Sequence, residues 1–298
     1  MHKYIPKKRG VYPYLLLLPL LLALILIIFY PILYSVYLSF NHYVLTTPSE
    51  IGFSGIENYV KILGDEVFWR SLRRTGMWIF WTIGFELLFG LMIAWLLDRK
   101  FPGRGIVRSL VLLPWVFPSI LTGLMWVWML DDTYGIINDF LVKVRLIDSY
   151  IPWLSLAGTA LYGIIAAQVW HGTPFFVIMI LAAMQGIPKE LYEAARIDGA
   201  NKWQEYWYIT WPHILPTVLI TTLLRTIWTA SYVEIIEIMT GGGPGESTLT
   251  LPVYAFRRAY SYLDFGYSAA LSLALVGMLS GLVWAYLRMM KMSRVEIL

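Results

Sequence analysis

The 298 residues are 58% hydrophobic and only 14% charged, with a formal net charge of +4 and a mean hydropathy of +0.64. Soluble domains carry about 25% charged residues, so much of this surface must meet something other than water. The absence of cysteine excludes disulfides, thiol catalysis and thiolate metal sites. The basic residues form no aromatic–basic array of the kind that binds nucleic acid, so we expect no nucleic-acid partner.

Six apolar runs are each long enough to cross a bilayer as a helix, which takes about 20 mostly apolar residues. Open strands would leave backbone groups unpaired in lipid, so all six are predicted as helices. The first run extends from Leu15 to about Phe40. It is far longer than the apolar core of about 7–15 residues in a cleaved secretory signal, and we expect it to remain as a span. The predicted spans cover about 14–40, 76–97, 109–130, 159–184, 216–239 and 267–287.

Prolines inside or near these spans predict kinks that neighbouring helices accommodate. They are Pro19, Pro31, Pro114, Pro118 and Pro174.

The distribution of Lys and Arg between the spans predicts their orientation. With the N-terminus inside, the inner segments hold 14 of these residues and the outer segments hold 8, and the cytoplasmic face normally has the excess. We therefore expect a multi-pass protein of the cell membrane with both termini cytoplasmic. The outer segments are short and no internal repeat is clear, so residues 1–298 are predicted to form a single all-α transmembrane domain.

The most informative stretch is the inner segment 185–215, between the fourth and fifth predicted spans. Pro188 suits a first helical turn, and Gly199 can end that helix in a left-handed conformation. Asn201 offers a new N-cap with Gln204 three residues on, as in a capping box. Two short helices are therefore predicted in a segment that is too polar to span.

These residues alone leave two interpretations of the segment equally open. Ala194 and Ala195 present little side-chain bulk, so a partner protein could approach closely. A solvated hairpin that contacts no partner explains the same pattern.

A family resemblance favours the partner interpretation. Glu193-Ala194-Ala195, three residues, Gly199, nine residues, Ile209 and then Trp211-Pro212 resembles the EAA coupling loop of binding-protein-dependent ABC importer permeases. Trp211 stands where that family usually has leucine, and the spacing is kept. Two further matches occur in the right order. The family's third core helix is resembled by Arg108-Ser-Leu-Val-Leu-Leu-Pro114 followed by Pro118. The fifth-to-sixth helix junction of the maltose and glycerol-phosphate type permeases is resembled by Met239-Thr-Gly-Gly-Gly-Pro244 followed by Asp264-Phe-Gly-Tyr-Ser-Ala-Ala270.

The resemblance covers nearly the whole chain and implies a type I ABC importer permease. Residues 188–199 would be a coupling helix seated in a groove of a cytoplasmic ATPase. The implied partners are two ATPase copies, which would bind ATP and Mg, a second homologous permease and an extracellular or periplasmic solute-binding protein. The expected ATPase-coupling residues are Glu193, Ala194, Ala195, Gly199, Ile209 and Pro212.

Polar residues at mid-bilayer depth are candidates for a transport pathway. Glu86, His171 and Arg225 fall at similar depth on the second, fourth and fifth predicted spans. Helical spacing places Thr229 and Tyr232 on the face of Arg225, and Gln168, Gly172 and Phe175 on the face of His171. By resemblance, positions that line the sugar cavity of maltose-type permeases are matched by Gln168, His171, Gly172, Phe175, Arg225, Thr229 and Tyr232.

Structural roles explain some of the same residues. Arg225 and Glu86 can pair with each other, because a lone charge in lipid is unfavourable. His171 can be a packed, hydrogen-bonded residue rather than a ligand. Glu234 and Glu237 lie near the outer end of the fifth span, where water or an extracellular partner can reach them.

No catalytic constellation is visible. Gly241-Gly-Gly-Pro-Gly-Glu-Ser247 superficially resembles a phosphate-binding loop, but Glu246 stands where that loop needs lysine. The four histidines show no ligand spacing, so we expect neither a metal site, nor a cofactor, nor an enzyme, and ATP hydrolysis is expected in a partner.

The sequence is therefore interpreted as a permease subunit of an ATP-driven sugar or oligosaccharide importer. The same machine could carry glycerol 3-phosphate or a related phosphodiester, for which Arg225 would be a sensible anion contact. A secondary transporter driven by an ion gradient is a more distant alternative, because only Glu86 could serve as its coupling carboxylate. An integral membrane enzyme is the least favoured reading.

Overall fold

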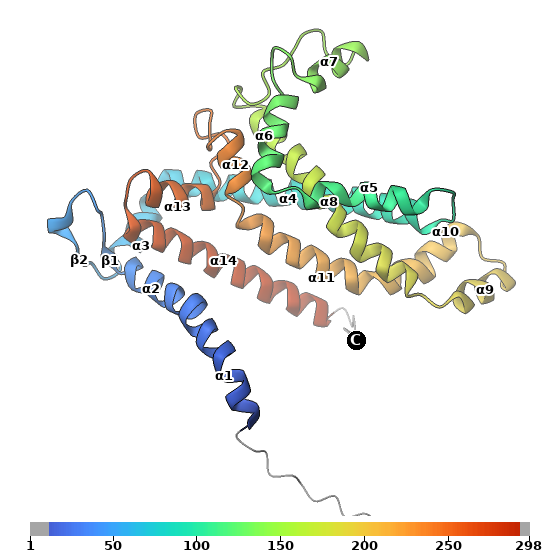
Figure 1. The fold of residues 1–298 in the computed structure, drawn as a ribbon, viewed down its shortest axis with the longest axis horizontal. Helices are drawn as coiled ribbons and strands as arrows, with labels where there is room; N and C mark the ends of the chain where they lie inside the picture. Colours follow the sequence, from blue (N-terminus) through green and yellow to red (C-terminus); the bar gives the residue numbers. More distant parts are fainter. Residues whose placement is uncertain (1–11, 293–298) are drawn as a thin grey trace, which may run out of the picture. The chain divides into compact units, whose positions relative to one another are not determined.

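The computed structural model describes residues 12–292, and almost every element in that range is a helix (Figure 1). Residue contacts group this part of the chain into two compact units. One comprises residues up to Gly64 together with Arg258–Leu273, and the other comprises Asp65–Arg257 and the residues from Ala274 onward. The single-domain assignment stays a prediction, and the terminal segments 1–11 and 293–298, which contribute to the orientation count, lie outside the described residues.

The first unit begins with an apolar helical run whose side chains are largely exposed. It consists of α1 (Tyr12–Leu24), a π-helical segment (Ile25–Phe29) and α2 (Tyr30–Ser39). Most of its Leu and Ile side chains are around half exposed or more, up to 73% at Leu16 and Ile27. Such a face requires an apolar environment outside the described chain.

A small polar turn structure follows this helical run. Strands β1 (Asn41–His42) and β2 (Gly52–Phe53) pair antiparallel around a 3₁₀ turn (Pro48–Glu50), and α3 (Glu57–Gly64) comes next. The buried amide of Asn58 donates to the carbonyl oxygens of Ser39 at 2.9 Å and Asn41 at 3.0 Å. This one side chain therefore ties α3 to the end of α2.

The second unit is built on helices that pack along one another (Figure 1): α4 (Glu66–Asp98), α5 (Arg104–Val116), α8 (Ala160–Gln185) and α11 (Trp211–Ala230). Their shared core contains Phe176, Ile180 and Ile214, all fully buried. A side chain at Gly90 would overlap Phe176, so this glycine lets α4 and α8 approach closely.

The third predicted span, 109–130, is wrong as a single helix, whereas the kink predicted at Pro118 is confirmed. The chain forms α5 and α6 (Ser119–Met129), and their axes differ by 98°. Pro118 lacks the N–H that would continue α5, and the residue before a proline is disfavoured in helical conformation. Phe117 accordingly adopts an extended backbone, with φ −70° and ψ 133°.

The fifth predicted span, 216–239, is also interrupted. α11 ends at Ala230, and α12 (Glu234–Met239) begins after a short break. At this break the Ser231 and Tyr232 N–H groups bond three residues back, to Trp228 and Thr229, which closes the helix instead of continuing it. Tyr232 therefore lies beyond α11, and the prediction that it shares a helical face with Arg225 and Thr229 is wrong.

Two π-helical segments stand immediately before prolines. Tyr30 N–H bonds to Ile25 and precedes Pro31, and Trp211 N–H bonds to Tyr206 and precedes Pro212. A proline cannot donate the next backbone hydrogen bond, so the preceding N–H reaches five residues back instead of four. The second segment, Tyr206–Thr210, leads directly into α11.

The remaining elements are α7 (Ile136–Lys143), the short helices α9 (Lys189–Ile197) and α10 (Lys202–Glu205), α13 (Leu251–Tyr260) and α14 (Phe265–Met292). The loop after α7 is organised by the buried Asn138. Its side chain bonds to the backbone of Asp131 and Ile151 and accepts from the Trp153 indole at 2.9 Å.

Length and composition identify four helices within residues 12–292 that could cross a membrane: Leu15–Ser39, Glu66–Asp98, Ala160–Gln185 and Phe265–Arg288. The bent pair α5–α6 counts as a fifth if it is one span. These segments correspond to five of the six predicted spans, and α11 is not among them.

Candidate functional site

The segment between α8 and α11 folds as a helical hairpin, as its sequence predicts. Helix α9 follows Pro188, whose backbone is extended, so the helix begins one residue later than proposed. It ends in a Schellman motif: Gly199 has a left-handed backbone with φ +82°, and Ala200 N–H bonds to Ala195 O while Gly199 N–H bonds to Arg196 O. The glycine is needed for this conformation, since little else adopts it without strain.

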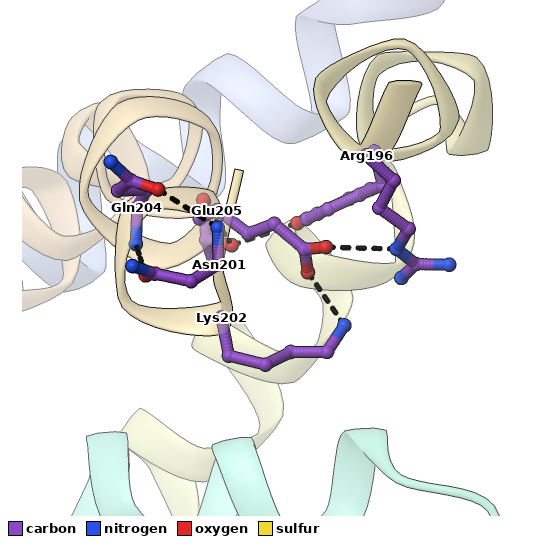
Figure 2. A network of polar contacts seen from close by, with 7 residues as sticks. Arg196, Asn201, Lys202, Gln204 and Glu205 are labelled. Carbon is purple, nitrogen blue, oxygen red and sulfur yellow. Dashed lines mark hydrogen bonds and ion pairs between the residues drawn. The ribbon is translucent and has the colours of Figure 1, made fainter. Parts of the chain in front are cut away.

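The capping box that opens α10 is confirmed. Gln204 N–H donates to the Asn201 side chain at 2.9 Å, and the Gln204 side chain accepts from Asn201 N–H at 2.8 Å (Figure 2). Two backbone donors at the start of the helix are thereby satisfied. The chain direction after α9 is therefore fixed by local polar contacts.

Glu205 joins the two helices of the hairpin. Its nearly buried carboxylate accepts from Arg196 Nε at 2.8 Å and from Lys202 Nζ at 2.8 Å (Figure 2). The hydrogen bond from Arg196, aided by Lys202, lowers the pKa of the Glu205 carboxyl. Tyr192 and Thr210 add a hydroxyl contact of 2.8 Å between α9 and the segment that leads into α11. These contacts hold one side of α9 against the rest of the unit.

The opposite side of α9 is free. Glu190, Glu193, Ala194 and Ile197 share one helical face and are exposed, and Ile197 is 87% exposed. Sequence reasoning missed Ile197, although its position four residues after Glu193 was the available signal. The hairpin thus presents an amphipathic face that nothing in the described residues covers.

The other predicted coupling residues have different surroundings. Ala195 is half-buried beneath the free face, and Gly199 is exposed at the end of α9. Ile209 packs against the core that α4 and α8 share, while Pro212 is exposed in the first turn of α11. The EAA spacing therefore combines exposed positions with positions that anchor the hairpin.

The middle of the helix bundle contains a buried ion pair. Arg225 on α11 donates through Nε to Glu86 on α4 at 2.9 Å, and its terminal nitrogen bonds to the second carboxylate oxygen. Both residues are at most 1% exposed. Of the two interpretations of these charges, the structure therefore has the one in which Arg225 and Glu86 pair with each other. The two parallel N–H groups of the guanidinium match the two oxygens of the carboxylate.

Gly172 of α8 makes room for this pair. A Cβ atom at position 172 would overlap Glu86 Oε1 and an Arg225 nitrogen. A residue without a side chain is thus required at position 172, because α8 approaches the charged side chains of α4 and α11 closely here.

A layer of polar side chains lies one helical turn from the ion pair. Gln168 on α8, Thr82 on α4 and Thr229 on α11 are fully buried. Their side-chain polar groups have no hydrogen-bond partner within the described residues. Such groups are unfavourable when buried dry, so this layer is suited to hold water or a polar ligand.

His171 is packed and hydrogen-bonded, which is the structural role predicted for it as the alternative to a ligand contact. It is 5% exposed, and its Nδ1 lies 3.0 Å from the Pro114 carbonyl oxygen. A proline at position 118 leaves the carbonyl of Pro114 without an intrahelical donor, and His171 takes that place. The ring thereby links α8 to the end of α5.

Aromatic rings surround Phe175 of α8, near the C-terminal end of α11. Phe175 contacts Trp228 at 5.1 Å and Trp115 at 5.8 Å between ring centroids. A cavity of about 370 Å³ next to this cluster is lined in part by Trp228, Tyr232 and Glu234. Sequence reasoning missed Trp115 and Trp228. The available signal was that each tryptophan is adjacent in sequence to a residue already singled out, Pro114 and Thr229.

No metal centre is described. Across residues 12–292, no group of three or more His, Cys, Asp or Glu side chains could hold a metal ion.

Comparison with known proteins identifies the family. Residues 86–291 match the model for the inner membrane component of binding-protein-dependent transport systems. The chain belongs to this family of ABC transporter permeases. The matched range includes both the ion pair and the helical hairpin.

Two relatives match over most of their length. The trehalose/maltose transport system permease protein MalF of Thermococcus litoralis is 34% identical over 98% of this chain and 97% of its own. The sulfoquinovosyl glycerol transport system permease protein SmoG of Agrobacterium fabrum is 36% identical over 93% of this chain and 89% of its own. Both relatives are named as permease proteins of transport systems.

A solved structure supports the fold. A chain of a bacterial ABC transporter involved in alginate import superimposes with a TM-score of 0.82, at 20% identity, over 95% of this chain and 96% of its own. The permease is thus a membrane component of an ABC transporter with a known type of fold.

The buried ion pair leads to the first prediction. Arg225→Met leaves the Glu86 carboxylate buried without its partner, which costs about 3–5 kcal/mol. We expect a lower thermal unfolding midpoint of the purified transporter complex and less assembled complex. The double variant Glu86→Met/Arg225→Met removes both charges and should recover most of the loss. Normal stability of Arg225→Met alone would contradict the structural role of the pair.

Glu205 leads to the second prediction. Glu205→Gln removes the charge that holds Arg196 and Lys202, and amide hydrogens of α9 should exchange with deuterium about fivefold faster. Because the pKa of Glu205 is lowered in the folded hairpin, its stabilisation is complete above the ordinary carboxyl range. It is lost as the pH falls through the lowered pKa.

The variant should therefore lack the acid-induced loosening of α9 that we expect of the natural hairpin. Asp139→Asn is the matched control, because it breaks the exposed Lys143–Asp139 pair of α7. Equal exchange in α9 for Glu205→Gln and the natural chain would disprove the role of Glu205.

Proposed function

We propose that the chain is the transmembrane permease of an ATP-driven importer for sugars or oligosaccharides, and that separate ATPase subunits hydrolyse the ATP. The family match supports the transporter class. The names of the two relatives support the substrate class, since they refer to trehalose/maltose and to sulfoquinovosyl glycerol. A structural neighbour was solved with an alginate pentasaccharide-bound periplasmic protein.

The free face of α9 is the observation that carries the proposal. Its carboxylates and the exposed Ile197 side chain form a surface that a groove of an ATPase subunit would cover. The Glu205 contacts on the other side of α9 would transmit movement of that groove to the bundle. Glu193, Ala194, Ala195 and Gly199 are the proposed coupling contacts, with Ile197 added.

The proposed orientation places the hairpin and both termini in the cytoplasm. The excess of Lys and Arg on that side supports it. Six crossings are then needed, with α5–α6 as a bent span and α11–α12 as an interrupted one. The proposed partners are two ATPases, which would bind ATP and Mg²⁺, a second permease and an extracellular or periplasmic solute-binding protein.

The substrate pathway is proposed along α8 and the outer end of α11. Gln168 and Thr229 offer unused hydrogen-bonding groups, and Phe175, Trp228 and Tyr232 offer aromatic faces. This combination suits a sugar. Arg225 is already neutralised by Glu86, so it is a poor contact for glycerol 3-phosphate, and Glu86 is a poor coupling carboxylate for an ion-driven transporter.

Co-purification tests the proposed function and provides the third prediction. A tagged chain extracted gently from its native membrane should retain an ABC-type ATPase and a second permease. After reconstitution with the binding protein, it should take up sugar only with ATP. A chain that transports without any ATPase, and loses uptake to an ionophore, would overturn the proposal in favour of a secondary transporter.

Variants of Ile197 connect this experiment to the free face. Ile197→Asp places a charge where an apolar contact with the ATPase is proposed, and ATP-dependent uptake should fall about tenfold or more. Ile197→Leu keeps the apolar contact and is the matched control. Full uptake with Ile197→Asp would exclude this face from coupling.

The aromatic surface gives the fourth prediction. Trp228→Ala removes a ring on which a sugar could stack, so the initial uptake rate at saturating binding protein should fall about tenfold. Trp228→Phe should retain most of the rate. Trp128→Ala is the control, since Trp128 is exposed on α6 and does not line the cavity next to Trp228. Equal losses for Trp228→Ala and Trp128→Ala would argue against a substrate contact.

A further inference from the structure

A strongly basic cavity lies at the end of the bundle where α4 ends, α5 begins and α8 ends. Its volume is about 870 Å³. Two acidic residues, Asp98 and Glu205, line it. Glu205 forms ion pairs with Arg196 and Lys202. Further cations line it without forming an ion pair in the described part of the chain; these are Arg99, Lys100, Arg104, Arg108 and Lys189.

Arg104 and Arg108 are the best-placed donors in this cavity. They lie one turn apart on α5, and the buried Nε atom of each has no hydrogen-bond partner within the described residues. The amide of Gln185 faces both guanidinium groups, and its oxygen, when turned toward them, accepts from both. Arg108 also donates to the Leu97 carbonyl oxygen at 3.5 Å. A guanidinium group has five N–H donors, so both arginines keep donors that suit the oxygens of a phosphate group.

A separate apolar cavity of about 540 Å³ also borders α5. Val107 and Val111 of α5 line it, together with Ile93 of α4 and residues of α8. Val107 lies three residues after Arg104, and Val111 lies three residues after Arg108. The apolar cavity therefore runs beside the turns of α5 that carry the arginines and extends past them. A ligand that fits both cavities needs an anionic head and an apolar tail.

Aromatic side chains mark this end of the bundle as a membrane–water boundary. Trp95 stacks under the Arg99 guanidinium at 3.7 Å, and Trp203 and Trp207 near α10 are 70% and 43% exposed. Tryptophan is enriched at the headgroup level of membranes. A headgroup phosphate would therefore lie at the depth where the basic cavity is found.

We propose that the two cavities together form a binding site for an anionic phospholipid. The phosphate is held by Arg104 and Arg108, and an acyl chain lies in the apolar cavity between α4, α5 and α8. Basic pockets between membrane helices commonly bind lipid headgroups in this way. The bound lipid would brace the start of α5 against the hairpin, and it is separate from the transported substrate.

Native mass spectrometry of the assembled transporter tests the proposal. The complex is taken from nanodiscs that contain phosphatidylglycerol, and the retained lipid is counted. Arg104→Gln/Arg108→Gln should retain about 30-fold less, since each basic contact contributes about a fivefold change. Arg104→Lys/Arg108→Lys should retain much of the lipid. Arg73→Gln/Lys143→Gln, which removes two exposed charges elsewhere, should change nothing.

Two further arms distinguish a lipid from a free anion and from a protein. Ala166→Trp fills the apolar cavity and should displace the lipid while the arginines remain. Inorganic phosphate at millimolar concentration should not replace the lipid. Unchanged retention in the Gln pair, phosphate that fully displaces the lipid, or a partner subunit seated in the cavity of the assembled complex would each overturn the proposal. None of these results depends on uptake activity.

Discussion

Two opposite charges in the middle of an apolar bundle place the strongest constraint on this structure. A single charge at that depth is unfavourable, so Glu86 and Arg225 must stay in contact if the helices are to stay together. Their contact joins α4 to α11, and it is possible only because α8 contributes Gly172 at the same level. Three helices are thereby held in one register by a polar interaction, whereas the apolar packing around them is less directional.

The helical hairpin is connected to this junction by continuous helix. α8 runs from Gly172 to the hairpin, and α11 runs from the hairpin back to Arg225, over about 20 Å in each case. Glu205 and Thr210 connect α9 to the segment that leads into α11, so a displacement of α9 would pull on α11. The polar layer of Gln168, Thr82 and Thr229 adjoins the junction. A change at the hairpin would therefore reach the region with unused hydrogen-bonding groups through a rigid path.

Charge is divided between two levels of the second unit, with different physical consequences. At the junction the charge of Arg225 is buried and balanced by Glu86, so it has little attraction left to offer an anionic ligand. At the hairpin end Arg104 and Arg108 are half-buried and have unused donors, so that end retains capacity to bind an anion. The aromatic cluster around Phe175 occurs near the other end of α11, where a neutral, hydroxyl-rich ligand would find both ring faces and hydrogen-bonding groups.

The sequence by itself determined the elements that depend on local chemistry. Proline, glycine and the Asn201–Gln204 pair predicted the ends of the hairpin helices, because caps act within a few residues, and the apolar runs predicted the helices. The spacing from Glu193 to Pro212 indicated the family. Only the tertiary structure decided what depends on contacts between distant residues. It paired Glu86 with Arg225, placed Gly172 against them, and brought Trp115 beside Phe175. It also set the 98° angle at Pro118, where the proline predicted a kink but not its size, and it interrupted the fifth predicted span after Ala230. Apolarity alone does not specify the direction of a helix or where it stops.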